Sequence, residues 1–335
     1  MFLKLFKSDR PITLFLIPFF TFLLWIPELY SDQVMTFHFD VKAAPLYLIF
    51  NDIPVNNPFL SRIVAFVFNL IISLLLVRLN SKFFFIPART NLPAFIYLFI
   101  VSTIPALQRF NPVILATLLF LITIDRVLTS YKFEGTSFHY FDASLFIGIS
   151  ALFYLPSVYF ILFVWAGLAS FRPFKWREWM FTLVGFLLPF LFLFTYFFWT
   201  KAGFLANFNQ LMINLKVQQS VFELSLYFKL FVLLMILFIL IASIHLMSNY
   251  TTRKIQTRKF YMFFLLIFLI SIFLYVTVSS IGLEIIYITA IPVTYLISHF
   301  FVFVKTKFIH SVLFMLFLLS VVACCYYNLV MGLFT

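Results

Sequence analysis

The stretch ASLFIGISALFYLPSVYFILFVWAGLAS, residues 143–170, decides the fold, because it can form either one long helix or two short ones. It is apolar throughout, and the segment after it, FRPFKWREW (171–179), is strongly basic. One long helix would put that basic segment on the outer side of a membrane, against the usual excess of Lys and Arg on the cytoplasmic side. Two helices keep it inside, and Pro156 lies near the first turn of the second, where proline is tolerated. The sequence therefore predicts a hairpin of two short helices, 143–153 and 155–170.

The rest of the chain has the composition of a membrane protein. Its 335 residues are 64% hydrophobic and 10% charged, with a mean hydropathy of +1.11. Apolar runs of up to about 20 residues, the length that crosses a hydrocarbon core of roughly 30 Å, recur from end to end. We predict an all-α, polytopic integral membrane protein with a single transmembrane domain, residues 1–335. The expected helices, about eleven in number, are 11–27, 59–79, 92–107, 113–127, 143–153, 155–170, 179–199, 226–247, 260–278, 283–304 and 308–331.

The distribution of charge predicts the orientation. Of the 23 Lys and Arg, 17 fall on one side of the predicted spans, which is therefore the cytoplasmic side. This places the N-terminus in the cytoplasm and the C-terminus outside, in an inner membrane of bacterial type. The net charge of +12 follows from the same bias, so we expect the lipid bilayer and no nucleic acid as a partner. The six Lys and Arg residues on the outer side are Lys42, Arg62, Arg109, Lys201, Lys216 and Lys229.

The outer loop between the first two spans, PELYSDQVMTFHFDVKAAPLYLIFNDIPVNNPFLS (27–61), is the expected place for chemistry. It holds four of the eleven acidic residues, namely Glu28, Asp32, Asp40 and Asp52. Asp32 and Asp40 are the candidate catalytic residues, because an outer carboxylate can accept a proton or hold a divalent cation. His38, two residues before Asp40, is a weak candidate metal ligand, with Mg²⁺ or Mn²⁺ as the expected ion. The alternative is that these side chains are only solvated. Residues 41–53 are apolar on one side and predict a helix in the membrane interface.

Three basic residues on the outer side are candidates for binding a phosphate. Arg62 and Arg109 lie at outer helix ends, where a guanidinium can pair with phosphate through two hydrogen bonds. Lys201 lies in the outer loop 200–225. The alternative is that they anchor helices by reaching the lipid headgroups. On the inner side, Asp125 beside Arg126 is interpreted as a helix-end carboxylate next to a charged partner.

The order of these features resembles the conserved module of the GT-C glycosyltransferases, over residues 32–189. The resemblance rests on an acidic outer loop after the first helix and on a series of punctuating residues. These are Pro45-Leu46-Tyr47, Ser61-Arg62-Ile63, Thr103-Ile104-Pro105, Gly148, Pro156, Gly185 and Pro189. It implies a GT-C-like module over 1–199, followed by a C-terminal helical part over 200–335.

The GT-C resemblance also implies a function. Enzymes of this family use polyprenyl-phosphate-linked sugars at the outer face of the membrane. Asp32 or Asp40 would then be the base or metal holder, and Arg62 and Arg109 would bind the donor phosphate. Two other functions stay open. One is a non-catalytic scaffold or lipid-binding subunit of a larger envelope complex, with a protein partner. The other is a flippase or a polymerase-like carrier of lipid or glycan.

Overall fold

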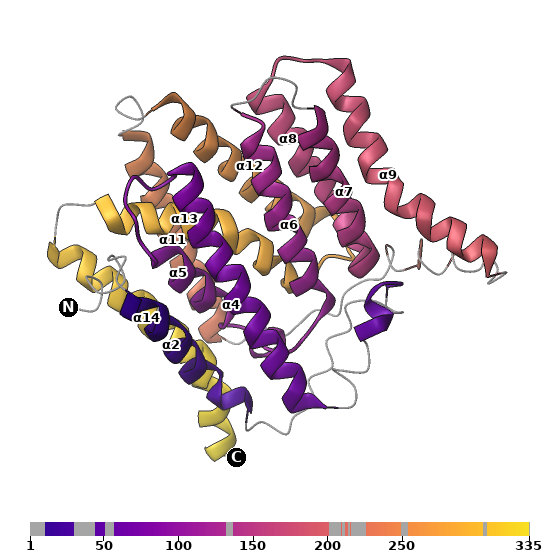
Figure 1. The fold of residues 1–335 in the computed structure, drawn as a ribbon. Helices are drawn as coiled ribbons and strands as arrows, with labels where there is room; N and C mark the ends of the chain where they lie inside the picture. Colours follow the sequence, from indigo (N-terminus) through magenta and orange to yellow (C-terminus); the bar gives the residue numbers. More distant parts are fainter. Residues whose placement is uncertain are drawn as a thin grey trace.

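The computed structural model describes residues 11–29, 44–50, 57–131, 137–200, 209, 212–213, 215, 226–248, 254–303 and 307–334. These residues form a helical bundle without strands (Figure 1). The elements are α2 (Pro11–Leu29), η1 (Tyr47–Phe50), α4 (Pro58–Phe83), α5 (Leu92–Val101), η2 (Pro105–Leu107), α6 (Pro112–Thr129), α7 (Ser137–Phe153), η3 (Leu155–Phe160), α8 (Ile161–Phe171), α9 (Trp176–Trp199), α11 (Leu226–Ser248), α12 (Ile255–Thr277), η4 (Leu283–Ile285), α13 (Ile286–Phe303) and α14 (Lys307–Phe334).

Within the described part of the chain, seven helices are long and apolar enough to cross a membrane. They cover residues 12–29, 58–83, 112–129, 176–199, 226–248, 255–277 and 283–303. Shorter apolar helices lie at 92–101, 137–153, 155–171 and 311–326. The predicted class, an all-α protein of the multi-pass membrane type, agrees with this arrangement.

The predicted hairpin is present. The first helix, α7, ends at Phe153, and Tyr154 has extended backbone angles (φ −138°, ψ 103°) before η3 begins. Pro156 lies at the start of η3, where its missing N–H is not needed. The chain then returns through α8, so that Arg172 donates a hydrogen bond to the carbonyl oxygen of Ser130 at 2.7 Å. The basic segment after α8 therefore lies at the same end of the bundle as the end of α6.

Two helix boundaries differ by six residues from those predicted. Helix α7 begins at Ser137, six residues before Ala143, because the buried Tyr140 satisfies its hydroxyl by hydrogen bonding with Ser130 at 2.9 Å. Helix α5 ends at Val101, although the apolar run continues to residue 107. Ile104 precedes Pro105 and is extended (φ −111°, ψ 104°), the conformation that proline imposes on the residue before it.

Glycines allow α7 and α9 to pack with their backbones in contact. A Cβ on Gly185 would lie 2.4 Å from the carbonyl oxygen of Phe141, and one on Gly148 would lie 2.6 Å from that of Phe186. Small residues of this kind permit close approach of helices in membranes. The C-terminal part of α9 leaves the bundle (Figure 1), and side chains such as Phe198 and Trp199 are exposed.

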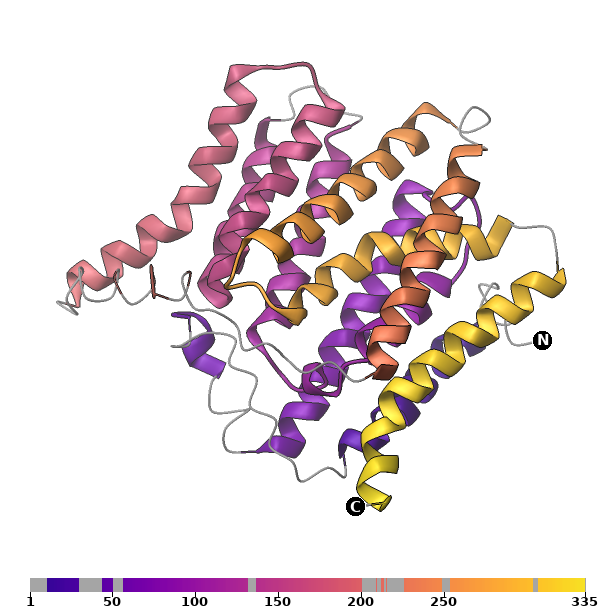
Figure 2. The same cartoon turned by 180° about the vertical axis from the view of Figure 1, so that it is seen from behind.

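The centre of the bundle is formed by α5 and α13. Every residue of α5 is buried, and so is most of α13, which packs against α5, α11 and α12 (Figure 2). Tyr295 of α13 donates a hydrogen bond to the carbonyl oxygen of Leu76 at 2.7 Å, and Tyr261 of α12 donates one to that of Phe85 at 3.2 Å. The first bond attaches α13 to α4, and the second attaches α12 to the segment directly after α4.

The two ends of the bundle differ in charge. At one end, where α4, α6 and α8 finish, Lys82 pairs with Asp125 at 2.6 Å and Arg126 with Asp142 at 3.6 Å. Lys259 lies over the ring of Tyr131 at the same end. We call this the basic end. The opposite end, where α2 finishes and α4 and α6 begin, is the site end, because it holds the cluster described next.

Candidate functional site

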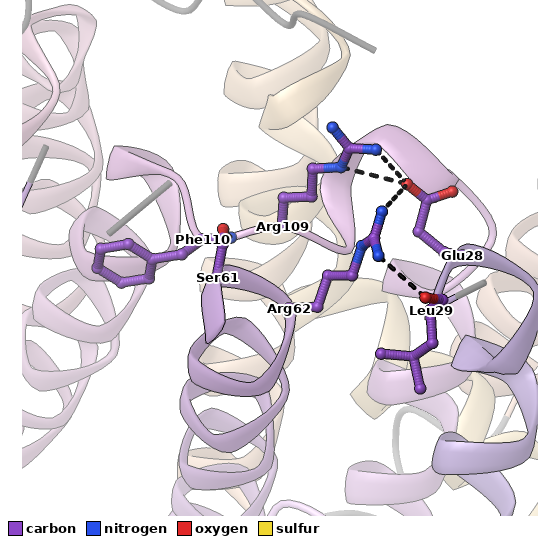
Figure 3. Close-up of polar contacts among 6 residues, drawn as sticks. All are labelled: Glu28, Leu29, Ser61, Arg62, Arg109 and Phe110. Atoms are coloured by element: carbon purple, nitrogen blue, oxygen red, sulfur yellow. Dashed lines mark hydrogen bonds and ion pairs between the residues drawn. The ribbon is translucent and has the colours of Figure 1, made fainter. Parts of the chain in front are cut away.

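At the site end, Glu28, Arg62 and Arg109 meet beneath the surface (Figure 3). Arg109 approaches Glu28 Oε1 through two nitrogens, Nη2 at 2.7 Å and Nε at 3.2 Å. Nη2 of Arg62 lies 4.0 Å from the same oxygen. The side chains of Glu28, Arg62 and Arg109 are only 10%, 8% and 16% exposed. We call these three residues the Glu28 cluster.

Each residue of the Glu28 cluster comes from a different segment. Glu28 lies in the last turn of α2, directly after Pro27. Arg62 lies in the first turns of α4, and its Nη1 donates a hydrogen bond to the carbonyl oxygen of Leu29 at 3.0 Å. A basic side chain that binds a terminal carbonyl in this way also stabilises the end of a helix. Arg62 therefore fixes the end of α2 and, with it, the position of Glu28.

Arg109 lies in the connection between η2 and α6, residues 108–111, which other elements hold in place. The N–H of Phe110 donates a hydrogen bond to Ser61 Oγ of α4 at 3.0 Å, and its carbonyl oxygen accepts one from Tyr47 of η1 at 3.4 Å. The side-chain amide of Asn111 donates to the carbonyl oxygen of Arg109 at 2.9 Å. The backbone at Arg109 is thus bound on both sides, which sets the direction of its side chain.

Asn111 links the connection to the centre of the bundle. Its side-chain oxygen accepts the N–H of Ile114 at 3.1 Å and so caps α6. Its amide also lies 3.3 Å from the hydroxyl of Tyr287 on α13, and that hydroxyl donates to the carbonyl oxygen of Leu107. Through Tyr287, the site end of α13 is therefore attached to Leu107 and Asn111, which lie on either side of Arg109.

The predicted interfacial element is described over residues 44–50, of which Tyr47–Phe50 form the short helix η1. Leu46 donates its N–H to the carbonyl oxygen of Leu152 at 3.0 Å, and Tyr47 is buried against the ring of Phe110. Burial raises the pKa of Tyr47, so its phenol stays neutral and donates. Leu48 and Ile49 are exposed. An inner face bound to protein and an apolar outer face suit a segment in a membrane interface.

The charges of the Glu28 cluster favour an anion as its ligand. Two guanidiniums and one carboxylate carry a net charge of +1. A guanidinium has five N–H donors and pairs best with two oxygens of a carboxylate or phosphate, whereas both Arg109 donors point to one oxygen of Glu28. The two guanidiniums of the cluster therefore have the chemistry that matches a phosphate.

A second buried carboxylate, Glu284, was not singled out by the sequence analysis. It lies in η4 at the start of α13, is fully buried, and accepts hydrogen bonds from Tyr154 Oη at 2.6 Å and from the N–H of Gly282 at 2.8 Å. The signal in the sequence is an acidic residue at the edge of an apolar span, where ionisable groups are rare and usually buried in protein. Glu284 joins the turn of the hairpin to α13.

The structure brings together two of the predicted site residues, Arg62 and Arg109, and adds Glu28 to them. The other predicted site residues are Asp32, Asp40, His38 and Lys201, and all four lie outside the described residues. Among the residues that are described, no group of three His, Cys, Asp or Glu could hold a metal. The expected Mg²⁺ or Mn²⁺ site stays a prediction that rests on Asp32, Asp40 and His38.

Comparison of this chain with protein-family models, with curated proteins and with solved structures gave no match. The class that the described residues define is that of a multi-pass helical membrane protein, with two arginines and a glutamate converging at one end of the bundle.

Proposed function

We propose that this protein is a GT-C-like enzyme of a bacterial-type inner membrane. It binds a polyprenyl-phosphate-linked sugar at the outer face and transfers the sugar to an acceptor. The observation that supports the proposal is the convergence of Arg62 and Arg109 on Glu28, at 4.0 Å and 2.7 Å respectively from the same oxygen. The GT-C-like module is residues 1–199, and the seven long and four shorter apolar helices together make up the eleven spans.

The orientation follows from charge. The basic end, with Lys82, Arg126, Arg172 and Lys259, faces the cytoplasm under the positive-inside rule. The site end then faces outward, and the N-terminus is cytoplasmic. The Glu28 cluster lies where the phosphate of a lipid in the outer leaflet would be. The exposed Leu48 and Ile49 of η1 anchor the neighbouring segment in the interface.

In the proposed reaction, an acceptor hydroxyl attacks the anomeric carbon of the donor sugar. A new bond forms between that carbon and the acceptor oxygen, and the bond from the carbon to the phosphate oxygen breaks. The electron pair of the broken bond leaves with the polyprenyl phosphate, whose growing charge Arg62 and Arg109 stabilise. Asp32 or Asp40 takes the acceptor proton. A divalent cation, when bound, would supply further positive charge at the leaving phosphate.

Arg109→Lys tests the proposal without removing a charge from the buried cluster. Lysine keeps the ion pair with Glu28 but loses the planar pair of donors, so we expect about a tenfold loss of lipid-phosphate binding and of sugar transfer. Arg126→Lys at the basic end is the matched control, because it changes the same residue type in an exposed ion pair with Asp142.

The measurement uses full-length protein in lipid nanodiscs with a polyprenyl-phosphate sugar and a radiolabelled sugar moiety. Asp32→Asn and Asp40→Asn are assayed beside it, and loss of transfer in one of them identifies the base. Transfer and binding that are equal in wild type, Arg109→Lys and Arg126→Lys would overturn the phosphate site.

A non-catalytic scaffold or lipid-binding subunit is the second proposed function. It is favoured by the C-terminal part of α9, which leaves the bundle (Figure 1). Phe192, Tyr196, Phe198 and Trp199 in this part of α9 are exposed. A partner protein in the membrane could cover this helix. Purification in mild detergent distinguishes the two functions: a stoichiometric partner and no sugar transfer favour the scaffold.

A further inference from the structure

We infer that Glu28 is a specificity-determining residue, which makes the Glu28 cluster select a monoanionic phosphodiester over a dianionic phosphomonoester. The inference rests on the proposed function, because it concerns the lipid phosphate that Arg62 and Arg109 would bind. It adds to that function the class of phosphate that the site prefers.

The geometry places a negative charge inside the phosphate site. Glu28 Oε1 lies 2.7 Å from Arg109 and 4.0 Å from Arg62, so any anion that reaches both arginines also lies close to this carboxylate. The side chains are at most 16% exposed, so water and salt screen the repulsion only in part. Each added negative charge on the ligand therefore costs more here than at an exposed site.

Repulsion by Glu28 gives the direction of the preference. Glu28 contributes one negative charge directly beside the two guanidiniums. A phosphodiester carries a single negative charge, whereas a phosphomonoester carries about −1.5 to −2 at neutral pH. The second charge of a monoester would lie against Glu28 in a poorly hydrated site, where a surplus of like charge is unfavourable.

The selection has a chemical consequence for the proposed reaction. A polyprenyl-phosphate sugar is a phosphodiester, and the polyprenyl phosphate left after transfer is a phosphomonoester. Glu28 would therefore favour binding of the donor and release of the lipid product. A residue that acted only as a structural ion pair would not distinguish the two phosphates.

Native mass spectrometry of the full-length protein tests the inference. The protein is placed in phosphatidylcholine nanodiscs with equal amounts of phosphatidylglycerol, a phosphodiester, and phosphatidic acid, a phosphomonoester, with the same acyl chains. At pH 8 we expect wild-type protein to retain phosphatidylglycerol preferentially. Glu28→Gln removes the repelling charge and keeps a hydrogen-bond acceptor for Arg109. We expect it to lower the ratio of diester to monoester bound by about tenfold.

Two variants provide the controls. Glu28→Asp keeps the charge and is expected to keep the preference. Asp142→Asn removes a carboxylate from the ion pair at the basic end and is expected to leave the ratio unchanged. An unchanged ratio in Glu28→Gln, or a wild-type preference for phosphatidic acid at pH 8, overturns the inference while leaving the phosphate site intact. Absence of selective binding of either lipid overturns the proposed function and the inference with it.

A measurement on wild-type protein does not depend on the folding of any variant. A phosphomonoester passes from a charge of −1 to −2 around pH 6. We therefore expect the ratio of phosphatidic acid to phosphatidylglycerol bound by wild-type protein to be higher at pH 5, where both phosphates carry one negative charge, than at pH 8. Among the described residues, the charged groups that face the phosphate are Glu28 of α2, Arg62 of α4 and Arg109 of the connection between η2 and α6. An equal ratio at both pH values contradicts the inference.

Discussion

The buried carboxylate of Glu284 shows how a single residue can be costly and still stabilise the fold. A carboxylate removed from water needs hydrogen-bond donors in compensation, and Tyr154 Oη and the N–H of Gly282 supply two, at 2.6 Å and 2.8 Å. Tyr154 lies in the turn of the hairpin and Glu284 at the start of α13, 130 residues later. Their hydrogen bond therefore stabilises the packing of two distant segments.

Tyr154→Phe removes this hydroxyl and leaves Glu284 without one of its donors. We expect the folded state to lose about 1–3 kcal/mol, the usual cost of leaving a buried polar group unsatisfied. Tyr159→Phe, in the short helix η3 that follows Tyr154 and only partly buried, is the matched control and should cost less than about 0.5 kcal/mol. The measurement is the midpoint of unfolding by SDS in mixed micelles. Equal midpoints for both variants would contradict a stabilising role for the Tyr154–Glu284 bond.

At the same scale, sequence reasoning found the arginines of the site but not their partner. Arg62 and Arg109 were predicted from their place at helix ends, which hydropathy alone can give. Their convergence with Glu28 depends on the packing of three segments, and no periodicity encodes it. Asp125 does have a charged partner near a helix end, but the partner is Lys82 and not the adjacent Arg126. Neighbouring residues on a helix point in different directions, so ion pairs form between helices instead.

At the scale of the elements, the contact between α7 and α9 depends on the absence of side chains. Gly185→Ala would place a methyl group 2.4 Å from the carbonyl oxygen of Phe141 and force the helices apart. We expect a loss of about 1–3 kcal/mol, as for other overpacked contacts. Val184→Leu, which adds a carbon to the exposed side of the same helix, is expected to be nearly neutral. Unfolding in SDS compares the two. A Gly185→Ala protein as stable as wild type would show that the helices can separate at little cost.

Hydropathy predicted that the helices exist, and the chemistry of single residues set where they end. The hairpin at 143–170 was predicted because a proline and a basic segment restrict the alternatives, and α7, η3 and α8 agree with it. The start of α7 was missed because polar residues such as Tyr140 can be buried when they are hydrogen-bonded. The end of α5 was missed because Ser102 and Thr103 lie within an apolar run and only the conformation before Pro105 shows the break.

For the whole molecule, the separation of charge between the two ends connects the fold to the proposed function. Ion pairs at the basic end are partly exposed, as for Lys82 and Asp125, while those of the Glu28 cluster are nearly buried. Exposed pairs contribute little to stability and are weakened by salt. A buried pair is more costly to form and to break, and it suits a site that must hold its geometry in the membrane. The function therefore depends on which end faces outward.

The orientation can be measured with two cysteine variants that are equally exposed. Ile49 in η1 is 72% exposed near the site end, and Phe174 is 73% exposed in the basic segment after α8. In a background with Cys324 and Cys325 replaced by alanine, we expect a membrane-impermeant maleimide to label Ile49→Cys in spheroplasts with an intact inner membrane. Phe174→Cys should react only after the inner membrane is permeabilised, because the positive-inside rule puts the basic end in the cytoplasm. Labelling of Phe174→Cys from outside, with Ile49→Cys protected, would show that the protein has the opposite orientation in the membrane. The Glu28 cluster would then face cytoplasmic phosphates, and transfer at the outer face would be excluded.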